Sequence, residues 1–204
     1  MRVYKKGSKG AAVTLIQKAL HVMADGQYGV LTEEAVRDFQ KASGLTADGI
    51  VGMKTLVRLG LVSLAPKSKR FINEIIIHCS ATPAGKDYTV DDIRMWHKQQ
   101  GWTDIGYHYV IYRDGTIHEG RSIDIAGAHC TGHNTHSIGV CYIGGIQRNG
   151  KTPSDTRTHA QKEALARLLG ELKVIYPTAR IHGHRDFAKK ACPSFDATRE
   201  YSSL

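Results

Sequence analysis

The strongest constraint on the fold is a pattern that occurs twice in the first part of the chain. The frame Asp-Gly-x-x-Gly-x-x-Thr begins at Asp25 and again at Asp48, 23 positions later. Asp-Gly favours a tight turn, the second glycine permits a positive φ, and the threonine can cap a following helix. Apolar residues recur at helical spacing before the first frame, at Val13, Ile16, Leu20 and Met23. The pattern therefore predicts a small bundle of short helices, joined by two matching turns, in residues 1–63.

The remainder of the chain has the pattern of an α/β domain. A segment without periodicity, residues 64–70, predicts a linker, and residues 71–204 form the second domain. This domain opens with a β-branched run from Phe71 to Ile77 that is typical of a buried strand. Further strands are predicted at 107–112, 116–118, 137–143 and 179–181, and helices at 89–101 and 158–176. Strands that alternate with helices, together with one hairpin, predict a mixed central sheet flanked by helices.

The net charge of +9 predicts an anionic partner, which can be a nucleic acid, a membrane surface or an acidic cell-wall polymer. The lysines and arginines are scattered, and neither a basic helix nor an interleaved aromatic motif supports binding to nucleic acid. No uninterrupted apolar run approaches the roughly 20 residues of a membrane span. We therefore expect neither a nucleic acid nor a membrane as a partner.

The cysteines and the start of the chain bear on where the protein is made. Four cysteines in 204 residues are too few and too widely spaced for a disulfide scaffold, so we expect reduced and mostly buried thiols. The basic residues near the start resemble a signal peptide, but Gln17, Lys18 and His21 interrupt the apolar stretch that should follow. We expect cytoplasmic synthesis without a signal peptide.

Residues 179–196 concentrate side chains that bind metals. His184 and Cys192 are zinc-ligand types, and the eight positions from one to the other let a loop bring both to one ion. A catalytic zinc usually has three protein ligands, and His78 is a candidate third because it ends the strand that opens the domain. His182 remains a rival to His184, since both lie on the same face of an extended chain. Cys79 should point away from His78, and we expect it to be packed.

Residues 6–61 resemble the three-helix peptidoglycan-binding module that accompanies many cell-wall hydrolases. The likeness is carried by both Asp-Gly frames and by Leu15-Ile16-Gln17, Ala35-Val36, Phe39-Gln40 and Gly44-Leu45. The resemblance implies an all-α domain of three helices that binds the wall polymer. Whether it binds glycan or peptide stays open.

The second domain resembles the type 2 N-acetylmuramoyl-L-alanine amidases, a group that includes the peptidoglycan recognition proteins. The likeness is carried by collinear motifs, among them Ile77-His78-Cys79-Ser80-Ala81-Thr82, Gly106-Tyr107-His108-Tyr109, Ser137-Ile138-Gly139-Val140 and Lys190-Ala191-Cys192-Pro193-Ser194-Phe195-Asp196. The resemblance implies the zinc amidase fold, with three Zn²⁺ ligands, two catalytic residues and two residues of the substrate groove. In that order these are His78, His184 and Cys192; Tyr107 and Lys190; and His129 and Asn134.

The implied activity is cleavage of the amide bond between N-acetylmuramic acid and L-alanine in peptidoglycan. Zinc lowers the pKa of its bound water to about 7, and the Tyr107 hydroxyl and Lys190 ammonium can stabilise an oxyanion. Lys189 is expected to be a surface residue. The chain has no glutamate in a His-Glu-x-x-His frame, so we expect Tyr107 to assist the zinc-activated water instead.

Two other functions compete with hydrolysis. Recognition proteins of the same fold that lack the cysteine ligand bind without cleaving, but Cys192 is present here. A nucleic-acid binder rests on charge alone. We therefore expect a monomeric peptidoglycan hydrolase of the phage or prophage endolysin type, which reaches the cell wall after release through a holin or lysis.

Overall fold

The protein is described by a computed structural model that covers residues 3–61 and 66–204. The chain divides into two compact units, Met1–Ala65 and Pro66–Leu204. The predicted domain end at residue 63, and residues 64 and 65 of the predicted linker, lie outside the described residues. The other end of that linker belongs to the second unit, because the Ser68 hydroxyl donates a hydrogen bond to the carbonyl of Ile123 at 2.7 Å.

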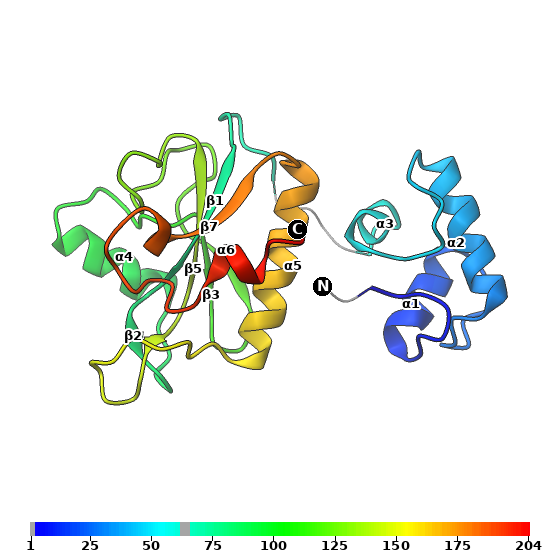
Figure 1. The fold of residues 1–204 in the computed structure, drawn as a ribbon, viewed down its shortest axis with the longest axis horizontal. Coiled ribbons are helices and arrows are strands. Elements are labelled where there is room, and N and C mark those ends of the chain that lie inside the picture. The colour runs from blue at the N-terminus through cyan, green and yellow to red at the C-terminus, as the bar shows by residue number, and fades with distance from the viewer. Residues whose placement is uncertain (1–2, 62–65) are drawn as a thin grey trace. The chain divides into compact units, whose positions relative to one another are not determined.

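The first unit is a bundle of three short helices, as predicted: α1 (Ala11–Ala19), α2 (Val30–Ala42) and α3 (Met53–Arg58) (Figure 1). Its core is formed by buried apolar residues of α1, of α2 and of the segments between the helices. These are Val13, Ile16, Tyr28, Val36 and Val51. The prediction that Met23 continues the apolar face of α1 is wrong, since Met23 is 81% exposed. The helix ends at Ala19, and the chain then turns through a positive φ of 56° at His21.

The sequence repeat corresponds to a repeated hydrogen-bond network. The amide nitrogen of Gln17 donates to Asp25 Oδ1 at 2.8 Å and to Thr32 Oγ1 at 3.1 Å. The amide nitrogen of Gln40 donates to Asp48 Oδ1 at 2.9 Å and to Thr55 Oγ1 at 3.2 Å. In both copies the glutamine oxygen accepts the backbone N–H of the turn glycine, at 2.8 Å from Gly26 and 2.9 Å from Gly49. A buried glutamine on the preceding helix therefore closes each turn, and the repeat extends back to Gln17 and Gln40.

The second unit is built on a five-stranded sheet with strand order β4-β3-β5-β1-β7. Its strands are β1 (Glu74–Cys79), β3 (Tyr109–Ile111), β4 (Ile117–Glu119), β5 (Ser137–Tyr142) and β7 (Arg180–Gly183). Strand β1 is parallel to β5 and to β7, and only β4 runs antiparallel, in the predicted hairpin with β3. The sheet is therefore mixed, as predicted. A small second sheet, β2 (Thr82–Pro83) with β6 (Gly145–Ile146), was not predicted.

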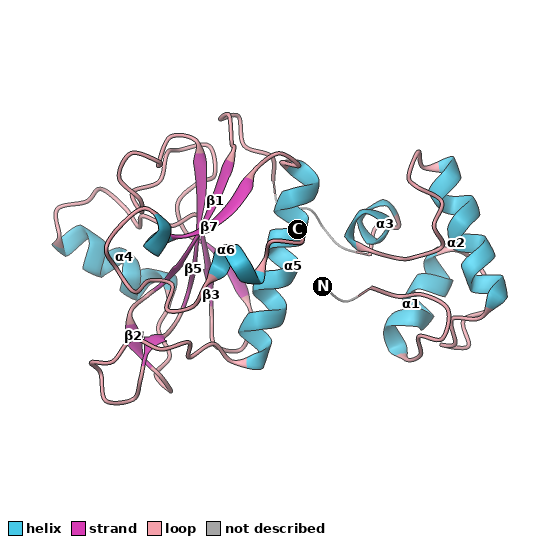
Figure 2. Cartoon of the chain, viewed as in Figure 1, coloured by secondary structure: helices cyan, strands magenta, loops and turns pink. Residues whose placement is uncertain are grey.

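Helices lie on both sides of this sheet (Figures 1 and 2). Helix α4 (Val90–Gln99) starts at a capping box made by Thr89 and Asp92, and its Ile93 packs with Val110 and Ile143. Helix α5 (His159–Ile175) starts at a second capping box and buries the predicted leucine face, Leu165, Leu168, Leu169 and Leu172. A single 3₁₀ turn, η1 (His184–Asp186), follows β7, and α6 (Ala197–Glu200) lies near the end of the chain.

Candidate active site

The parallel register of β1 and β7 brings two of the predicted ligands together. Ile77 pairs with Gly183, and the residue after each of them is a histidine, His78 on β1 and His184 at the start of η1, directly after β7. Their rings have centroids 4.6 Å apart. Both lie at the carboxyl ends of neighbouring parallel strands, which is where α/β sheets gather their ligand-binding residues.

Cys192 reaches the same point from the loop that follows η1. Its Sγ lies 3.8 Å from His78 Nδ1 and accepts a hydrogen bond from the backbone N–H of Cys79 at 3.3 Å. The Arg185 backbone N–H donates to the Cys192 carbonyl at 2.7 Å, so the segments that carry His184 and Cys192 are tied together. The ligand atoms of His78, His184 and Cys192 all lie within 4.8 Å of one another.

His129 holds the far side of the His78 ring. Its Nδ1 lies 3.0 Å from His78 Nε2, and its Nε2 lies 3.3 Å from the Ser137 hydroxyl. A neutral His129 can donate a hydrogen bond from Nε2 to the Ser137 hydroxyl and accept one at Nδ1 from His78 Nε2–H. His78 then carries its proton on Nε2, and its Nδ1 is unprotonated and directed at Cys192. A Cβ placed on Gly139 would lie 2.5 Å from Cδ2 of His129, and one on Gly127 would lie 2.4 Å from it. The ring is therefore held between two glycines.

The electrostatics of the site favour neutral imidazoles, which are the form that binds a metal. Burial, with the nearby His129, His184 and Lys190, lowers the pKa of His78 well below its usual value. Burial and the positive charge of Lys190 also lower the pKa of His184. Burial and the neighbouring His108 do the same for the pKa of His129. At neutral pH the cluster can therefore offer unprotonated nitrogens without competition from protons.

Tyr107 lies next to this cluster. Its ring centroid is 5.0 Å from that of His78 and 5.4 Å from that of His97, and the ring packs against the apolar cluster under α4. Burial raises the pKa of the Tyr107 hydroxyl well above its usual value, so this group keeps its proton at neutral pH. Lys190 is exposed, and its positive charge acts on both His78 and His184.

The other residues singled out in the sequence have structural contacts of their own. Asn134 Oδ1 accepts the backbone N–H groups of His129 and Cys130, both at 2.9 Å, and so fixes the loop that carries His129. His182 is not in the three-ligand cluster; its ring packs on Phe187 at 5.0 Å. Asp186 accepts the Gly183 N–H at 2.9 Å and closes the turn that begins at His184. Cys79, Cys130 and Cys141 are buried free thiols, and Cys192 is half-buried.

The resemblance implies a place in the substrate groove for His129; in the structure its partner is His78, and the residue is only 7% exposed. The contact makes His129 a positioning residue for His78. Glycines 127 and 139 are a signal for this arrangement, because residues without a side chain often mark a close approach. The groove role stays a prediction.

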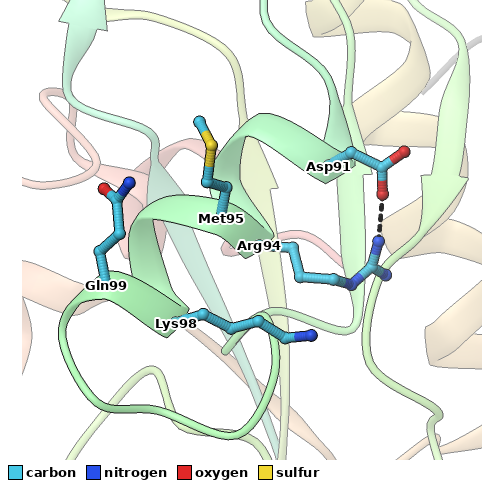
Figure 3. A pocket seen from close by; sticks show the side chains of 5 residues that line it. All are labelled: Asp91, Arg94, Met95, Lys98 and Gln99. Atoms are coloured by element: carbon cyan, nitrogen blue, oxygen red, sulfur yellow. Dashed lines mark hydrogen bonds and ion pairs between the residues drawn. The ribbon is translucent and has the colours of Figure 1, made fainter.

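A separate open pocket lies on the outer face of α4 (Figure 3). Five side chains line it, Asp91, Arg94, Met95, Lys98 and Gln99, and Arg94 pairs there with Asp91. None of the predicted site residues contributes to it. Among the described helices, none has the length and hydrophobicity to span a bilayer.

Comparison with known families and proteins gives consistent matches. Residues 68–195 match the family model described as N-acetylmuramoyl-L-alanine amidase, and residues 9–59 match that of a peptidoglycan binding domain. The endolysin of Klebsiella phage KP32 is 52% identical over 127 residues, which cover 62% of this chain and 83% of the relative. The endolysin of Escherichia phage T7 is 45% identical over 133 residues, which cover 65% of this chain and 87% of the relative.

Solved structures give the same assignment for the second unit. The endolysin LysCS of Clostridium intestinale, an N-acetylmuramoyl-L-alanine amidase, superposes with a TM-score of 0.55 at 29% identity, over 69% of this chain and 88% of the other. Drosophila PGRP-LB superposes with a TM-score of 0.51 at 31% identity, over 70% of this chain and 85% of the other. The mixed sheet with its flanking helices is the fold of these proteins.

Proposed function

Because the chain belongs to the N-acetylmuramoyl-L-alanine amidase family, we propose that it is a zinc-dependent endolysin in which His78, His184 and Cys192 bind the ion. Its reaction is hydrolysis of the amide bond between N-acetylmuramic acid and L-alanine in peptidoglycan. The observation that carries the proposal is the convergence of the three ligand atoms within 4.8 Å.

The chemistry of this donor set fits zinc. Two imidazole nitrogens and one thiolate are the soft and borderline ligands that zinc prefers, and three protein ligands leave one position open, as catalytic sites require. When bound, the ion polarises the scissile carbonyl and lowers the pKa of water. His129 supports the fit, since it holds His78 by Nε2 and leaves Nδ1 free to coordinate.

Tyr107 and Lys190 supply the groups that the reaction needs beside the ion. The Tyr107 hydroxyl keeps its proton, so it can donate a hydrogen bond to the oxyanion that develops on the scissile carbonyl. The Lys190 ammonium, two residues before Cys192, adds a positive charge that acts on His78 and His184. The Tyr107 oxygen can also accept a hydrogen bond from the attacking water and so orient it, and the proton that this water loses passes to the departing amine.

The first unit is expected to hold the enzyme on its polymeric substrate. Support comes from the match of residues 9–59 to a peptidoglycan binding domain and from the +9 charge, which favours an anionic wall. We further propose that the protein acts on the cell wall as a monomer, after release by a holin or by lysis; the relatives that it matches are named endolysins. Sedimentation with purified walls tests the binding role: the full chain should pellet, and a fragment that begins at residue 66 should stay in solution.

The zinc proposal is tested by hydrolysis of purified peptidoglycan, measured as the release of L-alanine amino groups. Dialysis against a chelator should abolish release, and one equivalent of Zn²⁺ should restore it. A chelated enzyme of undiminished activity, verified to hold no metal, would overturn the zinc mechanism while leaving the amidase assignment in place.

The catalytic roles are tested by Tyr107→Phe and Lys190→Ala. Each should lower kcat by about a hundredfold, the usual effect of losing one oxyanion donor, while zinc binding is retained. Lys189→Ala is the matched control, because Lys189 is the exposed neighbour and should have no effect. A Tyr107→Phe enzyme with the turnover of the wild type would exclude the role given to the hydroxyl.

A further inference from the structure

A second cluster of side chains of metal-ligand type lies at the other end of β1. Glu74, the first residue of β1, places Oε2 2.8 Å from His133 Nδ1 and 3.4 Å from His136 Nε2. The three ligand atoms lie within 4.8 Å of one another, as they do in the amidase site. Glu74 and His78 are four residues apart on one strand, so the two clusters are separated by about 13 Å.

The loop that carries the two histidines is fixed to the sheet. The His136 carbonyl accepts the backbone N–H groups of Asn73 and Glu74, at 3.0 and 3.3 Å. The Arg70 guanidinium donates to the carbonyls of this loop, those of Asn134, Thr135 and Ser137, each at 3.2 Å. The positions of His133 and His136 relative to Glu74 are therefore set by backbone contacts that do not depend on the cluster itself.

The ring orientations are also set from outside the cluster. The His133 ring packs on Phe187 with centroids 3.9 Å apart. His136 Nδ1 lies 3.2 Å from the Thr135 hydroxyl, which can accept its proton and leave Nε2 unprotonated toward Glu74. A hydrogen-bonded partner on the second ring nitrogen is the usual support of a metal-binding histidine.

We propose that Glu74, His133 and His136 form a second binding site for a divalent transition-metal ion of the Zn²⁺ class. Two imidazoles and one carboxylate are an established ligand set for zinc, and ligand bonds of about 2.0–2.2 Å in a tetrahedral site put the ligand atoms roughly 3.3–3.6 Å apart. Glu74 Oε2 already has this distance to His136 Nε2, at 3.4 Å, and it would move away from His133 Nδ1, now at 2.8 Å, when the ion binds. The side chains are 16% to 33% exposed, so the ion can enter from solvent and keep a water ligand.

The ion would stabilise the segments that support the amidase site. The cluster joins the start of β1 to the loop that carries His129, which in turn holds His78. Through Phe187 it also contacts the segment that leads to Lys190. Occupancy of this second metal site therefore stabilises the second unit, and hydrolysis takes place at the amidase site.

The competing explanation is a hydrogen-bonded cluster without a metal, in which both imidazoles donate N–H groups to the Glu74 carboxylate. The two explanations differ in stoichiometry. A hydrogen-bonded cluster adds no metal to the one equivalent of the amidase site, whereas the proposed site adds a second equivalent without a sulfur ligand.

The test titrates the metal-free, tag-free full chain with Co²⁺ and then with Zn²⁺. The wild type should bind two equivalents, one with the thiolate-to-cobalt absorption of Cys192 and one without it. His136→Asn and Glu74→Gln should lose only the equivalent without the thiolate band. Cys192→Ala should lose only the equivalent with the band. His159→Asn is the matched control, because His159 faces Glu163 at 3.5 Å on the surface of α5 and belongs to no three-ligand cluster among the described residues.

Thermal unfolding provides the second measurement. Zn²⁺ beyond one equivalent should raise the Tm of the wild type and of His159→Asn, and should leave that of His136→Asn unchanged. The His136→Asn protein loaded with one equivalent should hydrolyse peptidoglycan as the wild type does, which shows that it is folded. A wild type that binds a single equivalent, or a His136→Asn protein that still binds two, would refute the second site.

Discussion

The two units of the chain use buried polar side chains in opposite ways. In the first unit, Gln17 and Gln40 are nearly inaccessible, and both the amide nitrogen and the amide oxygen of each have hydrogen-bond partners at 2.8 to 3.2 Å. In the second unit, His78 is equally buried, but only its Nε2 has a partner at such a short distance, His129 at 3.0 Å. Its Nδ1 faces the Cys192 sulfur at 3.8 Å.

The difference separates a structural group from a functional one. A buried polar group without a partner costs free energy, so a fold that only needs to be stable satisfies every donor and acceptor, as the glutamine networks do. A ring that has a short hydrogen bond on one side, and on the other only a longer contact with a sulfur that can itself bind a metal, is prepared for a metal ion. The comparison therefore predicts that the glutamines govern stability alone and that the histidine cluster governs metal binding.

The largest expected effect is on the open side of His78. Cys192→Ser removes the sulfur ligand, and we expect hydrolysis of peptidoglycan to fall to the level of the blank without enzyme, because the site no longer retains its ion. The thiolate-to-cobalt absorption of the Co²⁺ protein should vanish as well. Cys130→Ser is the control, a buried thiol outside the ligand cluster that should retain both properties. Retained activity in Cys192→Ser would contradict the claim that the cluster around His78 governs metal binding.

The next effect is the response of the second unit to acid. Burial and the charge of Arg70, partly offset by a hydrogen bond to the Ile125 carbonyl, lower the pKa of His108 to about 4 from 6.5. The unfolded state then binds more protons between these values, so this stability is complete above pH 6.5 and is lost as the pH falls toward 4. The loss is about 3 kcal/mol for this group, from about 1.36 kcal/mol per pKa unit.

Urea unfolding of the metal-free protein at a series of pH values measures this effect. His108→Gln, which cannot take up a proton, should have a shallower pH dependence than the wild type. His78 and His129, whose pKa values are also lowered, should keep the slope from vanishing. Equal slopes in the two proteins would show that His108 does not contribute.

The sequence predicted local and periodic features well. The repeated turns, the helices that begin near Thr89 and Thr158 and the β1 strand were all predicted, because each depends on residues within a few positions of one another. The resemblance to known amidases supplied the three ligands, which the fold then placed in one cluster. Spacing alone did not distinguish His182 from His184. The parallel register of β1 and β7 does, and register joins segments about a hundred residues apart.

What the sequence did not reveal depends on contacts of the same long range. The hydrogen bond between His78 and His129 spans 51 positions, and the His129 ring is enclosed by Gly127 and Gly139, which belong to two further segments of the fold. The Glu74, His133 and His136 cluster was missed for the same reason, since its carboxylate lies 59 positions before the first histidine. Ser68 and Arg70 were assigned to a linker because a short polar segment gives no sign of its tertiary partners.

The structural role of the glutamine networks in the first unit is tested by replacing one glutamine at a time. Gln40→Leu leaves the N–H of Gly49 without its buried acceptor, and Gln17→Leu does the same to Gly26. Each change should destabilise the first unit by about 2 kcal/mol, the usual cost of an unsatisfied buried group, and the two costs should be nearly equal. Denaturant unfolding of the full chain, followed by hydrolysis of a soluble peptidoglycan fragment, should show lower stability with unchanged turnover.

The repeat itself supplies the control for that experiment. Gln27 is exposed and occupies the position that Ile50 holds in the second copy, so Gln27→Ile should leave stability unchanged. Unequal costs for Gln17 and Gln40 would mean that the two networks are not energetically equivalent despite their matching distances.

The smallest expected effect concerns the support of His78. In Gly139→Ala the new Cβ would lie 2.5 Å from Cδ2 of His129, so the ring must move and its hydrogen bond to His78 must lengthen. Partners of this kind change metal affinity by about tenfold or more, and we expect a loss near the lower end because all three ligands remain. Competition with a chelator of known affinity measures it, and Gly52→Ala, where nothing lies within 4 Å of the added carbon, is the control. If Gly139→Ala binds Zn²⁺ as tightly as the wild type, His129 merely fills space beside His78, and the distinction between held and open ring nitrogens loses its physical basis.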